Sequence, residues 1–238
     1  MIYGFDSRIR YSEVNRRQEL TVGAMINYFQ DCSLFHSEKI GLGIENLAGK
    51  KRAWVLSSWM LQIQKRPVFG QKVRIETWPY DFRGLFGYRN FIMKDEQGEC
   101  LVRANTLWVY LNTENGRPVR IDEEEKAGYT LESPLDMGEP VRKLSFPENA
   151  RECPKQYVML HQLDTNGHVN NGQYVQMAQD WLPADFTASG LRAEYKMQAK
   201  AGDEIIPWVA EQEDCWSVAL CTPAKKIYAV IEFIKKGK

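Results

Sequence analysis

Residues 161–182 read HQLDTNGHVNNGQYVQMAQDWL, and this stretch sets the plan of the whole chain. Its first part is rich in Asn and Gly, which predicts a tight turn. Apolar side chains then recur at helical spacing, so we expect a helix from about Asn170 to Leu182. A strand is expected before the turn, at Gln156 to His161. A strand, a polar turn and a helix therefore follow one another.

The first half of the chain contains a helix of the same kind. From Val22 onward apolar residues recur at helical spacing, and Gly41 and Gly43 end the pattern. Large apolar residues such as Leu34 and Phe35 lie on the other side of this helix. We therefore expect it to be buried nearly all round.

Each helix is followed by segments with the character of strands. In the first half these segments are 54–63, 72–78, 87–94 and 101–112, and in the second half 191–198, 204–212, 216–221 and 226–234. The chain between the halves is rich in Pro, Glu and Gly and has little periodicity, which is typical of a connector. The boundaries predicted from this pattern are 1–114 for an N-terminal unit, 115–150 for the connector and 151–238 for a C-terminal unit.

The two halves also match in sequence at an offset of 149 positions, which places Asn15 on Asp164 and Gly23 on Gly172. The identities are few, and chance alone can produce them. The repeated order of a helix followed by antiparallel strands is stronger evidence. We predict an α+β fold of two similar units, in each of which a curled sheet wraps a central helix. Pairing of two such units closes a sheet edge and face that one unit leaves open.

Composition excludes several classes of protein. Lys and Arg together number 31, as do Asp and Glu, so the basic excess typical of nucleic-acid binding is missing. Five cysteines form no CxxC pair, which argues against a zinc cluster or a disulfide framework and favours a reducing compartment. Residues 1–6 have neither the basic nor the apolar region of a signal peptide, and no apolar run approaches the length that spans a membrane. We expect a cytoplasmic protein without metal or cofactor.

One of the three histidines stands out as a candidate for chemistry. His36 lies on the apolar face of the first helix and is interpreted as a core residue, and His161 has no obvious partner. His168 shares a short polar segment with Asp164 and Asn166, just before a helix. Capping explains only one or two of these polar residues, whereas an extended strand would aim all three to one side. Clustered titratable groups mark functional sites, so we predict that these three residues form one.

The segment from Asp164 to Asn171, with Tyr174 behind it, resembles the Asp…His-Val-Asn-Asn signature of hotdog-fold thioesterases. It is most similar to that of the acyl-acyl-carrier-protein thioesterases, and the absence of a transit peptide resembles their bacterial branch. Residues 54–59, 76–78 and 103–109 resemble first-half strands of the same family, in the right order. The resemblance implies a tandem double hotdog that hydrolyses fatty acyl-[acyl-carrier-protein] thioesters in fatty acid biosynthesis. The implied partner is an acidic acyl carrier protein with a phosphopantetheine-linked acyl chain.

The family's catalytic Asp, Asn and His carry over to Asp164, Asn166 and His168. We expect Asp164 to orient the other two, to activate water or to attack directly through an anhydride. His168 would be the acid/base or water-holding group, and Asn166 would position water or the carbonyl. Free N–H groups at the start of the following helix would stabilise the oxyanion.

A Glu-Cys pair discussed for this family has no counterpart in the chain. When Glu194-Tyr195 is set on the family's Glu-Tyr, Gln198 and Ala199 stand where Glu and Cys would be. A cysteine nucleophile is not supported, because Ala199 has no thiol. A glutamate base is not supported either, because the Gln198 amide cannot take a proton near neutral pH. Gln198 and Asn170 remain candidates for contact with water or substrate.

At the same offset the first half carries Asn15, Arg17 and Glu19 in place of the catalytic residues, so no hydrolytic site is expected there. Its aromatic and Met-rich helix would instead line the acyl-chain pocket, although core packing explains any single residue. Arg192 and Lys200, with Lys196 between them, are candidates for a basic patch that receives the carrier. The alternative is that they are ordinary exposed strand residues.

Three other functions use the same features. An acyl-CoA thioesterase would share the motif, a hotdog dehydratase or hydratase also uses His and a carboxylate, and a non-catalytic acyl-binding protein would explain Gln198 and Ala199. A monomeric pseudo-dimer and a homodimer are both compatible with the duplication. Acyl-chain length is not predicted.

Overall fold

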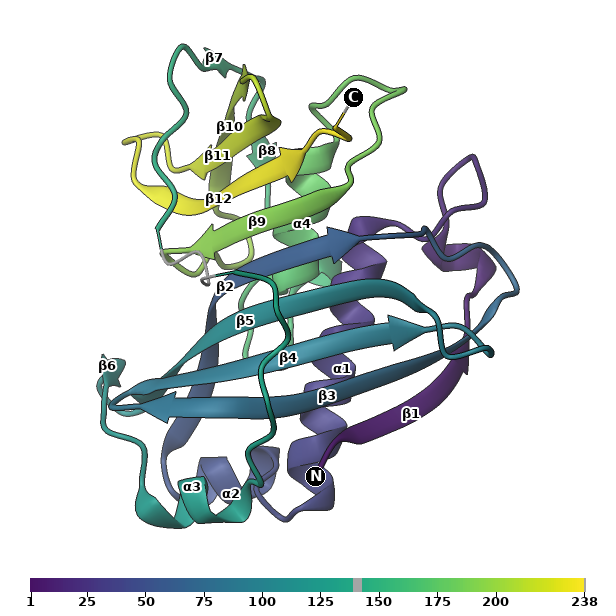
Figure 1. Ribbon diagram of the computed structural model, residues 1–238. Helices are drawn as coiled ribbons and strands as arrows, with labels where there is room; N and C mark the ends of the chain where they lie inside the picture. Colours follow the sequence, from purple (N-terminus) through teal and green to yellow (C-terminus); the bar gives the residue numbers. More distant parts are fainter. Residues whose placement is uncertain (139–142, 238) are drawn as a thin grey trace. The chain divides into compact units, whose positions relative to one another are not determined.

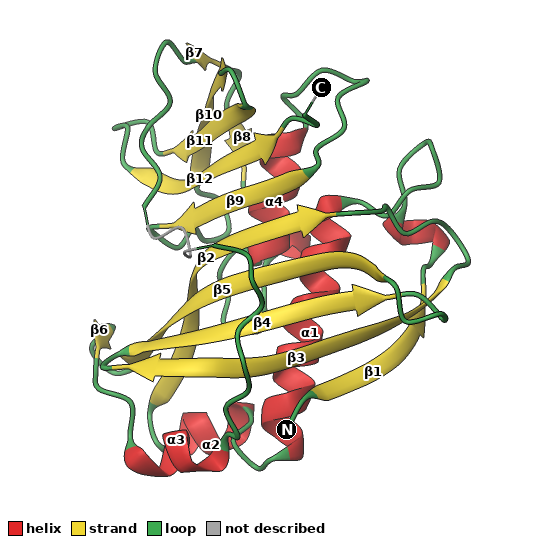
Figure 2. Ribbon diagram, viewed as in Figure 1, coloured by secondary structure: helices red, strands yellow, loops and turns green. Residues whose placement is uncertain are grey.

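The computed structural model describes residues 1–138 and 143–237, so part of the predicted connector lies outside the described residues. The chain forms two compact units, one of Met1–Ser57 with Ile63–Pro140 and the other of Ser58–Gln62 with Val141–Lys238. In each unit a helix packs on an antiparallel sheet (Figures 1 and 2). No helix in the described part of the chain is long and apolar enough to cross a membrane.

The sheet of the first unit has the strand order β1-β3-β4-β5-β2, and the short strand β6 pairs with β5. The strands are β1 (Tyr3–Arg8), β2 (Arg52–Ile63), β3 (Lys72–Arg83), β4 (Phe86–Lys94), β5 (Cys100–Asn112) and β6 (Arg117–Pro118). The helices are α1 (Val22–Lys39), α2 (Ile44–Gly49) and α3 (Glu123–Gly128), and a 3-10 turn, η1, spans Tyr11–Glu13. The four strands predicted in this half are thus confirmed. The strand predicted to end at Trp78 continues to Arg83 through a register shift between Pro79 and Asp81, the kind of irregularity that accommodates a proline.

Helix α1 (Val22–Lys39) covers one face of this sheet. It begins where the Thr21 hydroxyl accepts the Ala24 N–H at 3.2 Å, which caps the helix. Met25 and Phe29 on its inner face are fully buried, whereas Leu34 and Phe35 are 38% and 47% exposed. The prediction that this helix is buried nearly all round is therefore wrong. The sheet covers only one stripe of it.

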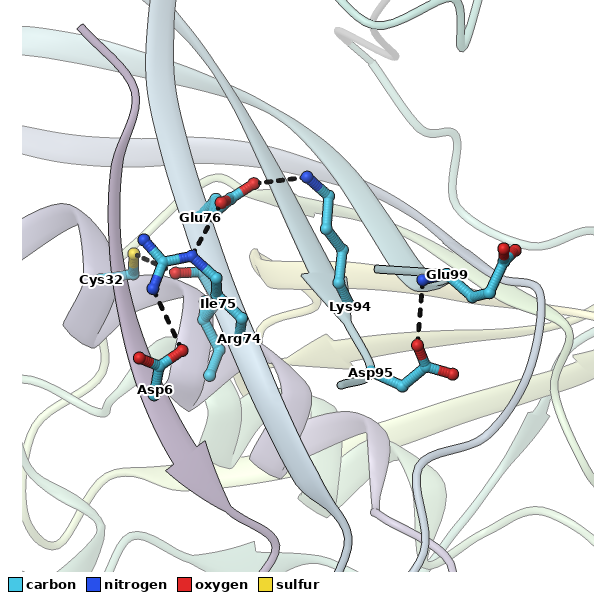
Figure 3. A network of polar contacts seen from close by, with 8 residues as sticks. All are labelled: Asp6, Cys32, Arg74, Ile75, Glu76, Lys94, Asp95 and Glu99. Carbon is cyan, nitrogen blue, oxygen red and sulfur yellow. Dashed lines mark hydrogen bonds and ion pairs between the residues drawn. The ribbon is translucent and has the colours of Figure 1, made fainter. Parts of the chain in front are cut away.

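A polar network runs across β1, β3 and β4 (Figure 3). Glu76 accepts hydrogen bonds from Arg74 at 2.9 Å and Lys94 at 2.7 Å, and Arg74 also contacts Asp6 at 3.1 Å. Ion pairs whose cations keep contact with solvent, as Arg74 and Lys94 do, contribute little to stability. In the same view the Cys32 thiol of α1 donates to the Ile75 carbonyl at 3.7 Å. Burial raises the pKa of this thiol to about 12, so Cys32 is a packing residue.

The second unit has the strand order β9-β12-β11-β10-β7, and residues Ser58–Gln62 of β2 pair with β9. Its elements are β7 (Arg151–Glu152), β8 (Gln156–Tyr157), the 3-10 turn η2 (Leu160–Gln162), α4 (Asn171–Gln179), β9 (Gly190–Tyr195), β10 (Glu204–Glu211), β11 (Cys215–Cys221) and β12 (Ile227–Ile234). Helix α4 packs against β11 and β12. The predicted order of elements is confirmed.

Three element ends in this unit differ from the prediction. The strand expected to reach His161 stops at Tyr157, because the Gln162 side chain accepts the Met159 N–H at 2.8 Å and closes η2. The helix expected to reach Leu182 ends at Gln179, shortly before Pro183. The strand expected to reach Gln198 ends at Tyr195, since the next two N–H groups both donate to the Tyr228 carbonyl and leave the ladder.

His36 of α1 is a core residue, as predicted. It is 3% exposed, its Nδ1 lies 3.0 Å from Arg89 Nη1, and its ring stacks on Tyr3 with centroids 5.5 Å apart. Because Arg89 can only donate, this nitrogen of His36 is the acceptor, and the ring is neutral. Burial, together with the Arg89 charge, lowers the pKa of His36 to about 4.

We predict that stability falls as the pH drops from 6.5 to 4. Over this range His36 binds a proton in the unfolded state, where its pKa is the ordinary 6.5, but stays neutral in the folded state. The free energy of unfolding therefore decreases as the pH falls. The full effect is about 3 kcal/mol. Urea unfolding followed by tryptophan fluorescence should show a flatter pH dependence for His36→Gln, which keeps an acceptor for Arg89 but does not titrate. An unchanged slope in this variant would assign the effect to other groups.

Candidate active site

The predicted catalytic residues lie in one tight loop of the second unit. Leu163 and Val169 form an antiparallel bridge that closes the loop, and Gly167 turns it with a φ of +74°. The Asp164 N–H donates to the His168 carbonyl at 2.7 Å across the loop. The extended strand expected to aim residues 164, 166 and 168 to one side is therefore wrong. The closing bridge brings these residues together instead.

The Asp164 carboxylate shapes this loop. Its Oδ1 accepts the Asn166 N–H at 2.8 Å and the His168 N–H at 3.1 Å. Hydrogen bonds from backbone N–H groups to a nearby Asp side chain are a local alternative to strand pairing, which explains why the segment does not extend. Asp164 and His168 are half-buried, and Asn166 is exposed. One carboxylate thus fixes the backbone on which the predicted amide and imidazole are mounted.

Asn170 caps helix α4 (Asn171–Gln179). Its side-chain oxygen accepts the Gly172 N–H at 2.9 Å, and its carbonyl accepts the N–H groups of Gln173 at 2.9 Å and Tyr174 at 3.4 Å. These N–H groups were expected to stabilise the oxyanion, and they are already engaged. Contact of Asn170 with water or substrate stays a prediction. It would involve the side-chain NH2 group, because the side-chain oxygen caps the helix.

Residues 196–199, here called the strand end, follow β9 and are fixed beside the loop. The Val169 N–H donates to the Ala199 carbonyl at 2.9 Å, and the Ala199 N–H donates to the Tyr174 hydroxyl at 2.8 Å. Gln198 directly precedes this residue and is exposed. The structure therefore brings Gln198 to the loop by its backbone, and its contact with water or substrate remains a prediction.

The cysteines of this unit are poor nucleophiles. Cys153, Cys215 and Cys221 are 4%, 3% and 0% exposed. Burial raises the pKa of each thiol, to about 11 for Cys221. A reactive cysteine needs a lowered pKa and access to substrate. The expectation that no cysteine serves as nucleophile is consistent with this burial.

The same loop occurs in the first unit. The Asn15 side-chain oxygen accepts the Arg17 N–H at 2.9 Å and the Glu19 N–H at 3.1 Å, and the Asn15 N–H donates to the Glu19 carbonyl at 2.8 Å. Gln18 takes a φ of +61°, as Gly167 does in the second loop. The sequence offset of 149 is therefore a structural repeat. A neutral amide oxygen shapes this copy, so the loop needs an acceptor at this position but no charge.

Two of the three residues predicted to form a basic patch are neutralised within the second unit. Arg192 pairs with Glu232 at 2.8 Å, and Lys196 pairs with Glu194 at 3.0 Å. Of the three, only Lys200 has no ion pair within residues 1–138 and 143–237. Carboxylates neutralise the positive charges of Arg192 and Lys196, so the predicted patch carries much less positive charge than the sequence suggested.

Comparison with known proteins assigns this fold and loop to a family. Residues 3–129 match the acyl-ACP thioesterase N-terminal domain, and residues 148–217 match the acyl-ACP thioesterase C-terminal domain. The chain belongs to the acyl-ACP thioesterase family. The predicted resemblance is thus confirmed, and each of the two matched regions contains one of the two repeated loops.

Curated relatives from plants agree with this assignment. The chain is 28% identical over 199 residues to oleoyl-acyl carrier protein thioesterase 2 of Arabidopsis thaliana, which covers 74% of this chain and 53% of that protein. It is 24% identical over 216 residues to palmitoyl-acyl carrier protein thioesterase of Gossypium hirsutum, which covers 83% of this chain and 52% of that protein. The chain spans about half the length of these curated relatives.

Solved structures confirm the tandem hotdog fold. An acyl-ACP thioesterase from Bacteroides thetaiotaomicron has a TM-score of 0.90 at 22% identity, covering 98% of this chain and 97% of that one. The 12:0-ACP thioesterase from Umbellularia californica has a TM-score of 0.87 at 19% identity, covering 100% of this chain and 98% of that one. At these identities the likeness concerns the fold.

Two substitutions separate the shape of the loop from its charge. Asp164→Asn keeps an acceptor, as Asn15 does in the first unit, and should change the free energy of unfolding by less than about 0.5 kcal/mol. Asp164→Ala leaves two N–H groups without their acceptor and should lower it by about 1–2 kcal/mol. Urea unfolding of both variants measures the difference. Equal losses in the two would show that charge, not the acceptor, holds the loop.

Proposed function

We propose that this protein hydrolyses fatty acyl-[acyl-carrier-protein] thioesters to free fatty acid and holo carrier protein, in fatty acid biosynthesis. The observation that carries the proposal is the loop of the second unit, where Asp164, Asn166 and His168 share a backbone shaped by one carboxylate. The names of the relatives support the substrate class, since both plant relatives are acyl carrier protein thioesterases.

The loop of the first unit indicates how Asp164 is used. There the Asn15 oxygen holds the loop, while its Nδ2 donates to the Glu19 carboxylate at 3.4 Å. His168 occupies the position of Glu19 in the repeat. Asp164 Oδ1 holds the loop, and by this analogy we propose that Oδ2 is the oxygen that pairs with the imidazole. Asp164 then orients His168 and stabilises the cation that forms when His168 takes a proton.

His168 is the proposed general base. It would remove a proton from the attacking water and return it to the leaving thiolate of the pantetheine arm. The N–H groups of Gly172, Gln173 and Tyr174 donate to Asn170, so side chains are proposed to stabilise the oxyanion. The exposed amide of Asn166 is the first candidate donor, and Gln198 at the adjoining strand end is the second.

Other features of the proposal concern the partner and the first unit. The acyl carrier protein delivers the acyl chain, and the role of the first unit as its pocket stays a prediction, since Met25 and Phe29 of α1 are fully buried in the core of that unit. Lys200 is the remaining cation of the three proposed to meet the acidic carrier. The cytoplasmic location, the oligomeric state and the domain boundaries at residues 114 and 150 stay predictions.

The function is tested by release of free thiol from acyl-carrier-protein and acyl-CoA thioesters of several chain lengths. We expect hydrolysis, with higher kcat/KM for the carrier-protein form. His168→Ala and Asp164→Asn should each reduce kcat roughly 100-fold, the usual scale for a lost acid or base group. Because Asp164→Asn keeps the loop, its loss of activity would report the loss of Oδ2 as a charged acceptor and not a change in the shape of the loop.

Two control variants define the site. Glu19→Ala changes the residue that corresponds to His168 in the repeat, and Cys153→Ser changes a buried thiol; both should keep wild-type kcat. Normal turnover in His168→Ala would remove the site assignment. Release from CoA thioesters alone would replace the carrier protein with CoA as substrate, and an enoyl product without thiol would indicate a dehydratase. Binding of acyl groups without any release would favour an acyl-binding protein.

A further inference from the structure

A buried hydroxyl of α4 holds the strand end beside the proposed catalytic loop. Ala199 is 0% exposed, and both of its backbone groups are engaged. Its carbonyl accepts the Val169 N–H at 2.9 Å, and its N–H donates to the Tyr174 hydroxyl at 2.8 Å. Tyr174 is 3% exposed and belongs to the first turns of the helix that follows the loop. One residue thus joins the loop, the helix and the strand end that carries Gln198.

The first unit contains the counterpart of this strand end. There the Leu20 N–H donates to the Pro67 carbonyl at 2.8 Å, as Val169 does to Ala199. The turns that follow repeat the same bonds, Gly70 N–H to the Ile9 carbonyl at 3.0 Å and Gly202 N–H to the Val158 carbonyl at 2.9 Å. Pro67 is therefore the structural equivalent of Ala199.

The two residues of the hydrogen bond have changed together between the units. Met25 stands in the first unit where Tyr174 stands in the second, at the offset of the repeated loop. Proline has no N–H to donate and methionine has no hydroxyl to accept one. The donor and the acceptor are both present in the second unit and both missing at the equivalent positions of the first. The bond thus accompanies the loop that carries His168.

A second hydroxyl ties the same strand to the same helix. The Tyr195 hydroxyl of β9 donates to the Asn171 carbonyl at 3.0 Å, and its ring lies 5.7 Å from the Tyr174 ring. Ile63 is its counterpart when Pro67 is set on Ala199. Burial raises the pKa of both tyrosines, to about 12 for Tyr174, so both remain neutral hydroxyls at working pH. Two hydroxyl contacts therefore fix the strand end in the second unit alone.

We propose that Tyr174 is a positioning residue for thioester hydrolysis, whose hydroxyl fixes Ala199 and so sets Gln198 at a constant distance from His168. The inference rests on the proposed function and deepens it. Tyr174 acts through the Ala199 N–H and does not touch the acyl chain. Loss of the hydroxyl leaves a buried N–H without a partner, and the strand end moves to regain one. Small displacements of this kind reduce the rate of the chemical step more than they weaken binding.

A double-mutant cycle tests this role. Tyr174→Phe should lower kcat roughly tenfold and leave KM within about twofold, since only the position of catalytic groups changes. Ala199→Pro removes the N–H and copies Pro67 of the first unit. In the Ala199→Pro background the Tyr174→Phe change should have no further effect on kcat, because the two residues act through one bond. Acyl-carrier-protein thioester of one chain length serves as substrate throughout.

Hydrogen exchange gives a second readout that does not depend on the proline variant. The amide of residue 199 should exchange faster in Tyr174→Phe than in the wild type, and the amide of Val169 should follow it. Tyr110→Phe is the matched control, since it removes a buried hydroxyl of β5 that donates to Asp122 at 3.1 Å. It should lower the unfolding temperature without changing kcat.

The outcomes separate this inference from the function on which it rests. No thiol release by the wild type from any thioester would end the proposed function. Hydrolysis by the wild type with unchanged kcat and unchanged exchange in Tyr174→Phe would overturn the positioning role. Tyr174→Phe could also lower kcat by the same factor in the wild type and in the Ala199→Pro variant. That result would overturn the positioning role, because the hydroxyl would then act on something other than this N–H.

Discussion

The acceptance of two backbone N–H groups by the Asp164 carboxylate is the contact on which the proposed site depends. It folds a segment that would otherwise extend and places Asn166 and His168 on one short loop. Asn15 makes the same two contacts in the first unit with a neutral oxygen. The shape of the loop therefore does not require charge. The negative charge at residue 164 is available for chemistry because the loop would form without it.

The two units keep one backbone plan and differ in the side chains mounted on it. In both, a 3-10 turn leads to a tight loop with a positive φ, at Gln18 or Gly167, and then to a capped helix. Where the first unit has Glu19, the second has the imidazole of His168. The second unit also fixes the adjoining strand end through the Tyr174 hydroxyl. The repeat thus separates what folding requires from what the proposed reaction requires.

Much of the fold could be predicted from the sequence, because its cause is local. Segments with the character of strands predicted the sheet, and the offset that places Asn15 on Asp164 proved to be a structural repeat. The extended strand through Asp164 could not be excluded from sequence, since alternate polar residues suit a strand and a side-chain-capped loop equally well. The exposed side of α1 at Leu34 and Phe35 was missed because periodicity alone does not show which stripe a sheet covers.

Contacts between distant residues were the part that sequence could not give. The ion pairs of Arg192 with Glu232 and Lys196 with Glu194 depend on which strands become neighbours and on which sheet face the side chains share. The equivalence of Pro67 and Ala199 was hidden because the segments between helix and strand end differ in length, so the offset of the loops does not align them. Only the shared hydrogen-bond pattern reveals it.

The central claim is that the loop of the second unit, and not its copy, receives the reacting carbonyl. A crystal structure with a non-hydrolysable acyl-pantetheine analogue tests this most directly. We predict that the carbonyl analogue lies about 3 Å from a side chain of the loop formed by residues 164–168, within hydrogen-bond reach. A carbonyl bound at residues 15–19 of the first unit, or away from both loops, would contradict the account.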